Sequence, residues 1–249
     1  MNQPTPTPTS TDADTDTDIK IDAADAEIAR LTEALRGVPD PDWLADARTR
    51  LVTDPASLPV LFAATGRRCG RADLADAPGW SADEAARALL LADLSTVTST
   101  AELAAAVGDC YHHGDAAERR AVLKALPLLP IGDRAVPLLH DAIRTNDTRL
   151  VAAALGRYAR HLDQPAWRQA VLKCVFTGVP LAAVHDLDAR ADGELLTMLA
   201  GLDEERTAAG RTLPADALAL LARLRAAPTS PGNSPGAAPT VGTTTRQEG

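Results

Sequence analysis

Three arginines lie close together in the stretch GRRCGR at positions 66–71. Arg67, Arg68 and Arg71 carry guanidinium groups, which bind phosphate or carboxylate through paired N–H donors. The alternative is a solvated loop at the C-terminal end of a helix, where cations are favourable in any case. Asp73 and Asp76 follow closely and can neutralise the loop. The stretch is therefore a candidate anion site, with a plain basic turn as its alternative.

A lysine interrupts an apolar run near the centre of the chain. Lys173 lies between Leu172 and Cys174, and helical spacing places it on one face with Gln169 and Phe176. A lysine in such a position can be partly desolvated and functional. The alternative is that its aliphatic stem covers apolar neighbours while its ammonium group reaches water.

Cys110, His112 and His113 form the closest grouping of metal-ligating residue types. Cys110 and His113 are three residues apart, so both can enter one ligand shell. A structural zinc site needs four ligands, usually from two tight pairs, and the sequence offers no second pair. We therefore expect no metal site. Neither a catalytic signature nor a cofactor motif is recognisable, and we expect no cofactor.

Helix-start signals recur along the chain. Asp-Pro at 40–41 and 54–55 combines a capping side chain with a proline suited to the first turn. The stretch from Ser81 to Glu84 is a capping box, and in the same helix Asp83 and Arg87 are four residues apart, which predicts an ion pair at the surface. Further helices are expected to start near Thr100, Asp115, Asp133, Asn146, Pro165 and Val179.

Residues 144–180 hold two adjacent helical patterns. Asn146 is the expected N-cap of the first, with Asp147 adding negative charge at the positive end of the helix dipole. The second carries Trp167, Val171 and Cys174 on one face. This stretch has the densest run of aromatic and polar side chains, and it joins the arginine stretch as a candidate site.

The recognisable elements are helices of about ten to fifteen residues joined by short turns. Apolar residues make up 45% of the chain and aromatics only 3%, and Ala and Leu favour helices over strands. Helix pairs recur about every thirty residues, as in helical repeat proteins. The predicted fold is all-α, an irregular HEAT-like α-solenoid, with a compact helical bundle as the alternative.

The ends of the chain differ in composition from its middle. Residues 1–18 are rich in Thr, Pro and Asp and residues 228–249 in Pro, Gly and Thr, so both are predicted to be disordered tails around a single helical domain at 19–227. The net charge of −9 disfavours non-specific nucleic-acid binding. Three separated cysteines and the lack of a secretory signal or membrane-length apolar run lead us to expect a cytoplasmic protein without a membrane span.

The chain resembles the EboA family of bacteria. The resemblance rests on the segments GRRCGR, YHHGDAAERRAVLKALPLL, RTNDTRLVAAALG and WRQAVLKCVFTGVPLAAV and extends from about Trp43 to Leu221. Arg144, Asn146, Gln169 and Lys173 match the polar positions of the family. Such positions can also be structural, Asn146 as a helix cap and Arg144 in tying down a helix end.

The resemblance implies a place in an operon linked to metabolite traffic, meaning movement or processing of secondary-metabolite precursors. The neighbouring products, a prenyltransferase-like protein, a TatD-like hydrolase and a sugar-phosphate isomerase-like protein among them, or a small metabolite, are the implied partners. The family provides no established catalytic residue.

Three functions follow as hypotheses. The first is a non-enzymatic binding or scaffold protein in metabolite traffic. The second is an enzyme or ligand-binding accessory for an isoprenoid or phosphorylated metabolite, which requires Arg67, Arg68, Arg71, Arg144 and Lys173 to converge in one basic pocket. The third is an interaction module with an exposed apolar groove and no small-molecule site.

Overall fold

The computed structural model describes residues 11–226, with side chains described from Ala23 onward, and this part of the chain is all-helical. No strand forms within it, although an isolated antiparallel bridge joins Asp73 and Ser81. The helices are α1 Thr11–Ala34, α2 Pro41–Thr53, α3 Leu58–Arg68, α4 Ala82–Ser95, α5 Thr100–His113, α6 Ala116–Ala125, α7 Val136–Arg144, α8 Thr148–Ala154, α9 Gln164–Thr177, α10 Leu187–Arg190, α11 Gly193–Ala208 and α12 Ala215–Ala226. Short 3-10 turns are η1 Leu35–Gly37, η2 Pro55–Ser57, η3 Leu126–Leu128, η4 Arg157–His161 and η5 Leu181–Ala183.

The N-terminal boundary differs from the expected one. Helix α1 begins at Thr11, so residues 11–18, predicted to belong to a disordered tail, are helical. The expected boundary came from composition, and composition does not specify the residue at which a helix begins. The remaining predicted tail residues, 1–10 and 228–249, lie outside the described part of the chain.

Several predicted helix starts are confirmed by their caps. The Asp40 side chain accepts a hydrogen bond from Trp43 N at 3.2 Å, and Pro41 is the first residue of α2. Asp115 and Glu118 form a capping box at α6, with bonds of 2.8 and 2.9 Å. At α4, the Glu84 carboxylate accepts from Ser81 N at 3.1 Å. Local side-chain chemistry therefore sets these starts.

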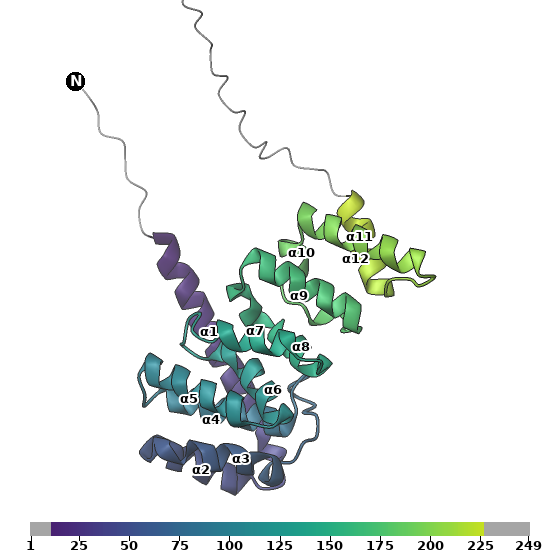
Figure 1. Cartoon of the computed structure of the whole chain (residues 1–249). Helices are drawn as coiled ribbons and strands as arrows, with labels where there is room; N and C mark the ends of the chain where they lie inside the picture. The colour runs from purple at the N-terminus through teal and green to yellow at the C-terminus, as the bar shows by residue number, and fades with distance from the viewer. Residues whose placement is uncertain (1–10, 227–249) are drawn as a thin grey trace, which may run out of the picture.

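The helices contact their neighbours in a regular order (Figure 1). Helix α3 packs on α4, α5 on α6 and α7 on α8, while α2, α4, α6 and α8 also contact one another in succession. The row continues through α9, α11 and α12, and α1 lies against α4. The even-numbered helices α2 to α8 therefore form a row, and α3, α5 and α7 pack against it.

Helix α4 is buried on every side. All of its residues except Asp93 and Ser95 are buried, and Asp93 forms a bidentate ion pair with Arg48 of α2 at 2.6 and 2.9 Å. A helix without a solvent-facing side lies at the centre of a domain core.

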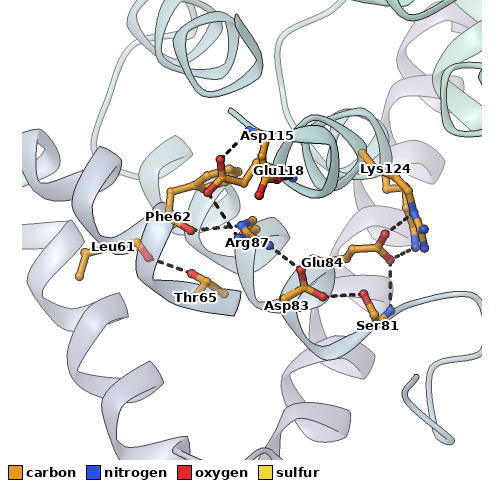
Figure 2. A network of polar contacts seen from close by, with 11 residues as sticks. Leu61, Phe62, Thr65, Ser81, Asp83, Glu84, Arg87, Asp115, Glu118 and Lys124 are labelled. Carbon is orange, nitrogen blue, oxygen red and sulfur yellow. Dashed lines mark hydrogen bonds and ion pairs between the residues drawn. The ribbon is translucent and has the colours of Figure 1, made fainter. Parts of the chain in front are cut away.

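The core at α4 contains charged groups (Figure 2). Arg87 is 1% exposed and donates to Asp83 Oδ2 at 2.7 Å and to the Phe62 carbonyl at 3.1 Å. Its Nη2 lies 3.5 Å from Glu118 Oε1 of α6. The prediction of a surface Asp83–Arg87 pair is therefore wrong, because α3 and α6 cover the face of α4 that carries both residues.

Arg190 joins the C-terminal helices to the preceding part of the chain. Its guanidinium donates to the carbonyls of Ala159 at 2.8 Å and Leu162 at 2.9 Å, and to Gln164 Oε1 at 3.1 Å. It also lies over the ring of buried Trp167, 4.8 Å from the centroid. The arginine thus satisfies loop carbonyls that packing alone would leave unpaired.

The ion pair between α9 and α11 leads to a pH prediction. Arg168 contacts Asp192 at 2.6 Å and lowers the pKa of that carboxyl to about 2. Because the folded pKa lies below the ordinary value of 3.8, the stabilisation is present above about pH 4 and is lost as the pH falls toward 2. Asp192→Asn keeps an N-cap, so we expect it to cost about 1 kcal/mol or less at pH 6, since the pair is partly exposed, and clearly less at pH 2, where the carboxyl is partly protonated. Urea denaturation at both pH values checks this; an equal cost at pH 2 would contradict it.

Candidate functional site

A cleft of about 590 Å³ opens beside Trp80, and we call it the Trp80 cleft. Four segments distant in sequence line it: α1, the loop before α4, α6 with η3, and α8 with the start of η4. The lining residues are Glu27, Arg30, Gly79, Trp80, Arg120, Leu123, Lys124, Pro127, Leu128, Arg149, Ala152, Ala153, Gly156 and Arg157. Five of these side chains are cationic and one is acidic.

A buried carboxylate holds two of the cations in place. Arg120 and Lys124 are four residues apart and so share one face of α6. Both form ion pairs with Glu84, which is only 3% exposed. The Ser81 backbone N–H also donates to this carboxylate (Figure 2). The heads of Arg120 and Lys124 are therefore fixed at one point by the central helix.

Trp80 forms part of the wall between α1 and α6. Its indole N–H donates to Glu27 Oε1 at 2.9 Å, and Lys124 Nζ lies 4.5 Å from its ring centroid. Lys124 also donates to the Gly79 carbonyl. Burial lowers the pKa of Lys124, and the Glu84 carboxylate opposes that shift. Trp80 thus links the acidic and basic sides of the cleft.

The other three cations differ in how they are paired. Arg30 makes a bidentate contact with Glu27 at 2.9 and 2.6 Å, and this contact lowers the pKa of Glu27. Arg149 pairs with Asp147 at 2.8 Å. Arg157 is exposed, and no hydrogen bond or ion pair joins it to the side chains described from Ala23 onward.

The arrangement suits an acidic ligand. Five cationic side chains and the acidic Glu27 surround a space whose remaining wall is apolar or small, formed by Gly79, Trp80, Leu123, Pro127, Leu128, Ala152, Ala153 and Gly156. Guanidinium and ammonium groups bind oxyanions, and apolar walls strengthen that attraction by excluding water. The cleft can therefore hold a molecule with an anionic group and an apolar body.

Comparison with protein families gives a match over most of the chain. The family described as metabolite traffic protein EboA matches residues 43–222. The chain belongs to the EboA family. Comparison with curated proteins and with solved structures gives no match. The match includes the α6 and α8 walls of the Trp80 cleft, whereas Glu27 and Arg30 of α1 precede it.

In this EboA protein, the arginine stretch at 67–71 lies away from the Trp80 cleft. Arg67 and Arg68 are exposed in the last turn of α3, not in a loop, and Arg71 is exposed just beyond it. Arg68 pairs with Asp40 at 3.1 Å and lies over the ring of Trp43. This arginine therefore helps to fasten the end of α3 to the start of α2.

Three of the other predicted residues share a second pocket, of about 570 Å³, which we call the Phe176 groove. It lies between α9 and α11 and is lined by Asn146, Gln169, Leu172, Lys173, Phe176, Thr177, Thr197, Met198, Gly201, Leu202 and Glu205. Phe176 is 69% exposed. Asn146 and Gln169 are exposed, and neither side-chain amide has a hydrogen-bond partner in the described part of the chain.

Lys173 and Asn146 have roles other than those expected. Lys173 is half-buried and donates to the Thr145 carbonyl at 2.7 Å, so it caps the C-terminal end of α7. Asn146 is not the N-cap of α8; Asp147 is, accepting from Arg149 N at 2.9 Å. The N-cap lies one residue later than predicted, so the Asp147 side chain reaches the first-turn N–H groups and the Asn146 side chain does not.

The single basic pocket required by the second hypothesis does not form from its predicted residues. The Phe176 groove contains Lys173 but none of Arg67, Arg68 or Arg71. Arg144 lies outside the groove as well, exposed at the end of α7 and paired with Asp141 at 3.2 Å. Five cations do converge, but they are Arg30, Arg120, Lys124, Arg149 and Arg157.

Local sequence patterns pointed to part of the set of cations that lines the Trp80 cleft. Arg120 and Lys124 have i,i+4 spacing on α6, and Glu84 belongs to a recognisable capping box. That these groups meet depends on the packing of α4 on α6, which local patterns do not show.

Cys110 and His113 line a separate pocket of about 400 Å³ beside Phe62 and Glu118. Burial raises the pKa of the Cys110 thiol to about 12, so the thiol remains protonated at neutral pH. Within the described chain, no group of three or more His, Cys, Asp or Glu residues is placed to hold a metal ion.

Proposed function

We propose that the chain is a non-enzymatic binding protein that holds an acidic small metabolite in the Trp80 cleft and so takes part in metabolite traffic. The observation that carries this proposal is the convergence of five cations, two of them fixed by buried Glu84, around one apolar-walled space. The family description supplies the traffic role.

The charge of the whole chain supports a specific cleft. The net charge is −9, so the molecule as a whole repels anions. The protein surface as a whole therefore does not attract an anion. Attraction is confined to short range at the cleft, where arginine and lysine are in local excess. Delivery of a precursor requires binding and release, and an open cleft permits both.

Native mass spectrometry tests this proposal. The full chain is incubated with a small-molecule extract of its host, as wild type, Arg157→Ala and Arg160→Ala. Both arginines are exposed in η4, but only Arg157 lines the cleft, so Arg160→Ala is the matched control for charge. We expect wild type and Arg160→Ala to retain an acidic molecule that Arg157→Ala largely loses. A bare wild-type chain, or equal retention by Arg157→Ala, would overturn the proposal.

A scaffold for another product of the same operon is the second candidate, and the Phe176 groove favours it. The unpaired amides of Asn146 and Gln169 offer a donor and an acceptor each to the main chain of an extended peptide, and Phe176 offers an apolar contact. Co-purification of the operon products with wild type but not with Phe176→Ala would favour this role. Val60→Ala, at an equally exposed valine on α3, is the control.

Three further proposals concern the setting of the site. The succession of contacts α2–α4–α6–α8 supports an irregular HEAT-like stack, and we propose this architecture in place of a compact bundle. We propose that the helices from α1 to α12 form one domain. The three free cysteines support a reducing cytoplasmic location.

No helix among the described residues is both long enough and apolar enough to span a bilayer.

A further inference from the structure

The charges at the Trp80 cleft do not balance. Four of its five cations contact three carboxylates: Glu27 pairs with Arg30, Asp147 with Arg149, and Glu84 with both Arg120 and Lys124. Two positive charges are left over, one shared by the Arg120–Lys124 pair and one on Arg157. Uncompensated charge of this kind at a partly enclosed site attracts counter-charge from a ligand.

We infer that the ligand presents a compact dianion of the phosphate-monoester type to the Trp80 cleft. This inference rests on the proposed function and specifies the ligand of the same site. A phosphate monoester carries close to two negative charges at neutral pH on three acceptor oxygens of one group. It therefore matches two surplus cations more closely than a carboxylate or a sulfate ester, each of which carries one charge.

The fixed part of the site is the Arg120–Lys124 pair. Glu84 is buried and bound from three directions, by Arg120, by Lys124 and by the Ser81 backbone N–H. Lys124 also donates to the Gly79 carbonyl, and its Nζ lies 4.5 Å from the ring centroid of Trp80. The position of this cationic pair is therefore set before a ligand arrives, which reduces the entropy lost on binding.

The movable part is Arg157. It is exposed at the first position of η4 and lies close enough to Glu27 to help lower the pKa of that carboxyl. A guanidinium without a partner in the described chain can reorient to take two oxygens of a phosphoryl group. Ala153 and Gly156 also line the cleft, and because one has only a methyl group and the other has no side chain, they leave space for that movement.

Two probes of equal size and different charge test the inference. Phenyl phosphate is a dianion at pH 8, since its second pKa is about 6, and phenyl sulfate is the corresponding monoanion. Isothermal titration of the full chain with each probe gives two dissociation constants for wild type, Arg157→Ala and Arg160→Ala. We expect wild type and Arg160→Ala to bind phenyl phosphate about tenfold more tightly than phenyl sulfate. In Arg157→Ala the ratio should fall to about twofold, because one surplus charge is gone.

The outcomes separate this inference from the proposed function. Equal affinity for the two probes, with both weakened by Arg157→Ala, would overturn the dianion and leave an anion-binding cleft. A preference for phenyl phosphate that Arg157→Ala does not reduce would also overturn it, since the second charge would then come from elsewhere. If neither probe binds the wild type, the dianion inference fails, and the native mass spectrometry experiment decides the proposed function separately.

Discussion

Replacing Arg87 by methionine is expected to lower the free energy of unfolding by about 3 to 5 kcal/mol. The methionine side chain fills much of the same space, so the loss comes from charge and hydrogen bonding. Asp83 is 2% exposed, and it would stay buried without its cation. The Phe62 carbonyl would also lose its donor. Guanidinium chloride denaturation measures the effect.

An exposed arginine provides the control for this prediction. Arg144→Met removes a guanidinium that pairs with Asp141 at the surface, and we expect a change within about 0.5 kcal/mol. The double variant Asp83→Leu/Arg87→Met should recover much of the stability lost by Arg87→Met, because no charge of the pair remains buried. A loss below about 1 kcal/mol for Arg87→Met would contradict the buried network.

Replacing Trp167 by alanine is expected to cost about 3 to 5 kcal/mol. The ring is fully buried in the first turn of α9 and carries Arg190 on its face. Its loss would leave a cavity between α9 and its neighbours and remove the surface on which Arg190 rests. Thermal and denaturant unfolding measure the cost. Trp43→Ala, at a half-buried tryptophan on α2, should cost clearly less.

The variant Trp167→Phe separates the contribution of packing from that of hydrogen bonding at position 167. The Trp167 indole N–H is the one buried side-chain polar atom without a partner in the described structure. Trp167→Phe removes that unsatisfied donor and keeps an aromatic face for Arg190. We therefore expect about half the cost of the alanine variant. An equal cost would show that the indole N–H has a partner such as a buried water molecule.

Much of the fold follows from composition and caps. Abundant Ala and Leu with few aromatics predicted helices, and the Asp-Pro and capping-box signals predicted where several of them begin. The family was also predictable from segments that lie within the matched range. The predicted N-cap was wrong by one residue where two capping residues are adjacent, as with Asn146 and Asp147. Either side chain can accept a hydrogen bond from the N–H groups of the first turn.

The site could be predicted only in part, because it is assembled by tertiary packing. Asn146, Gln169 and Lys173 do share a groove, since α9 and the start of α8 are close in sequence. The Trp80 cleft combines α1, α6 and α8, and no local spacing relates Arg30 to Arg120 or Arg157. Similarly, the spacing of Asp83 and Arg87 is the same whether their helix lies at the surface or in the core.

The fully enclosed position of α4 has a consequence for genetic screens. A comprehensive substitution library scored by cell growth would rank Asp83, Glu84 and Arg87 among the least tolerant positions, alongside small alanines such as Ala85 that have no room for a larger side chain. Charged positions that tolerate no change resemble catalytic residues in such a map. Here substitutions at these positions would reduce growth because the protein fails to fold. Arg157, at the exposed rim of the cleft, would instead contact the ligand, and most substitutions there leave the fold intact.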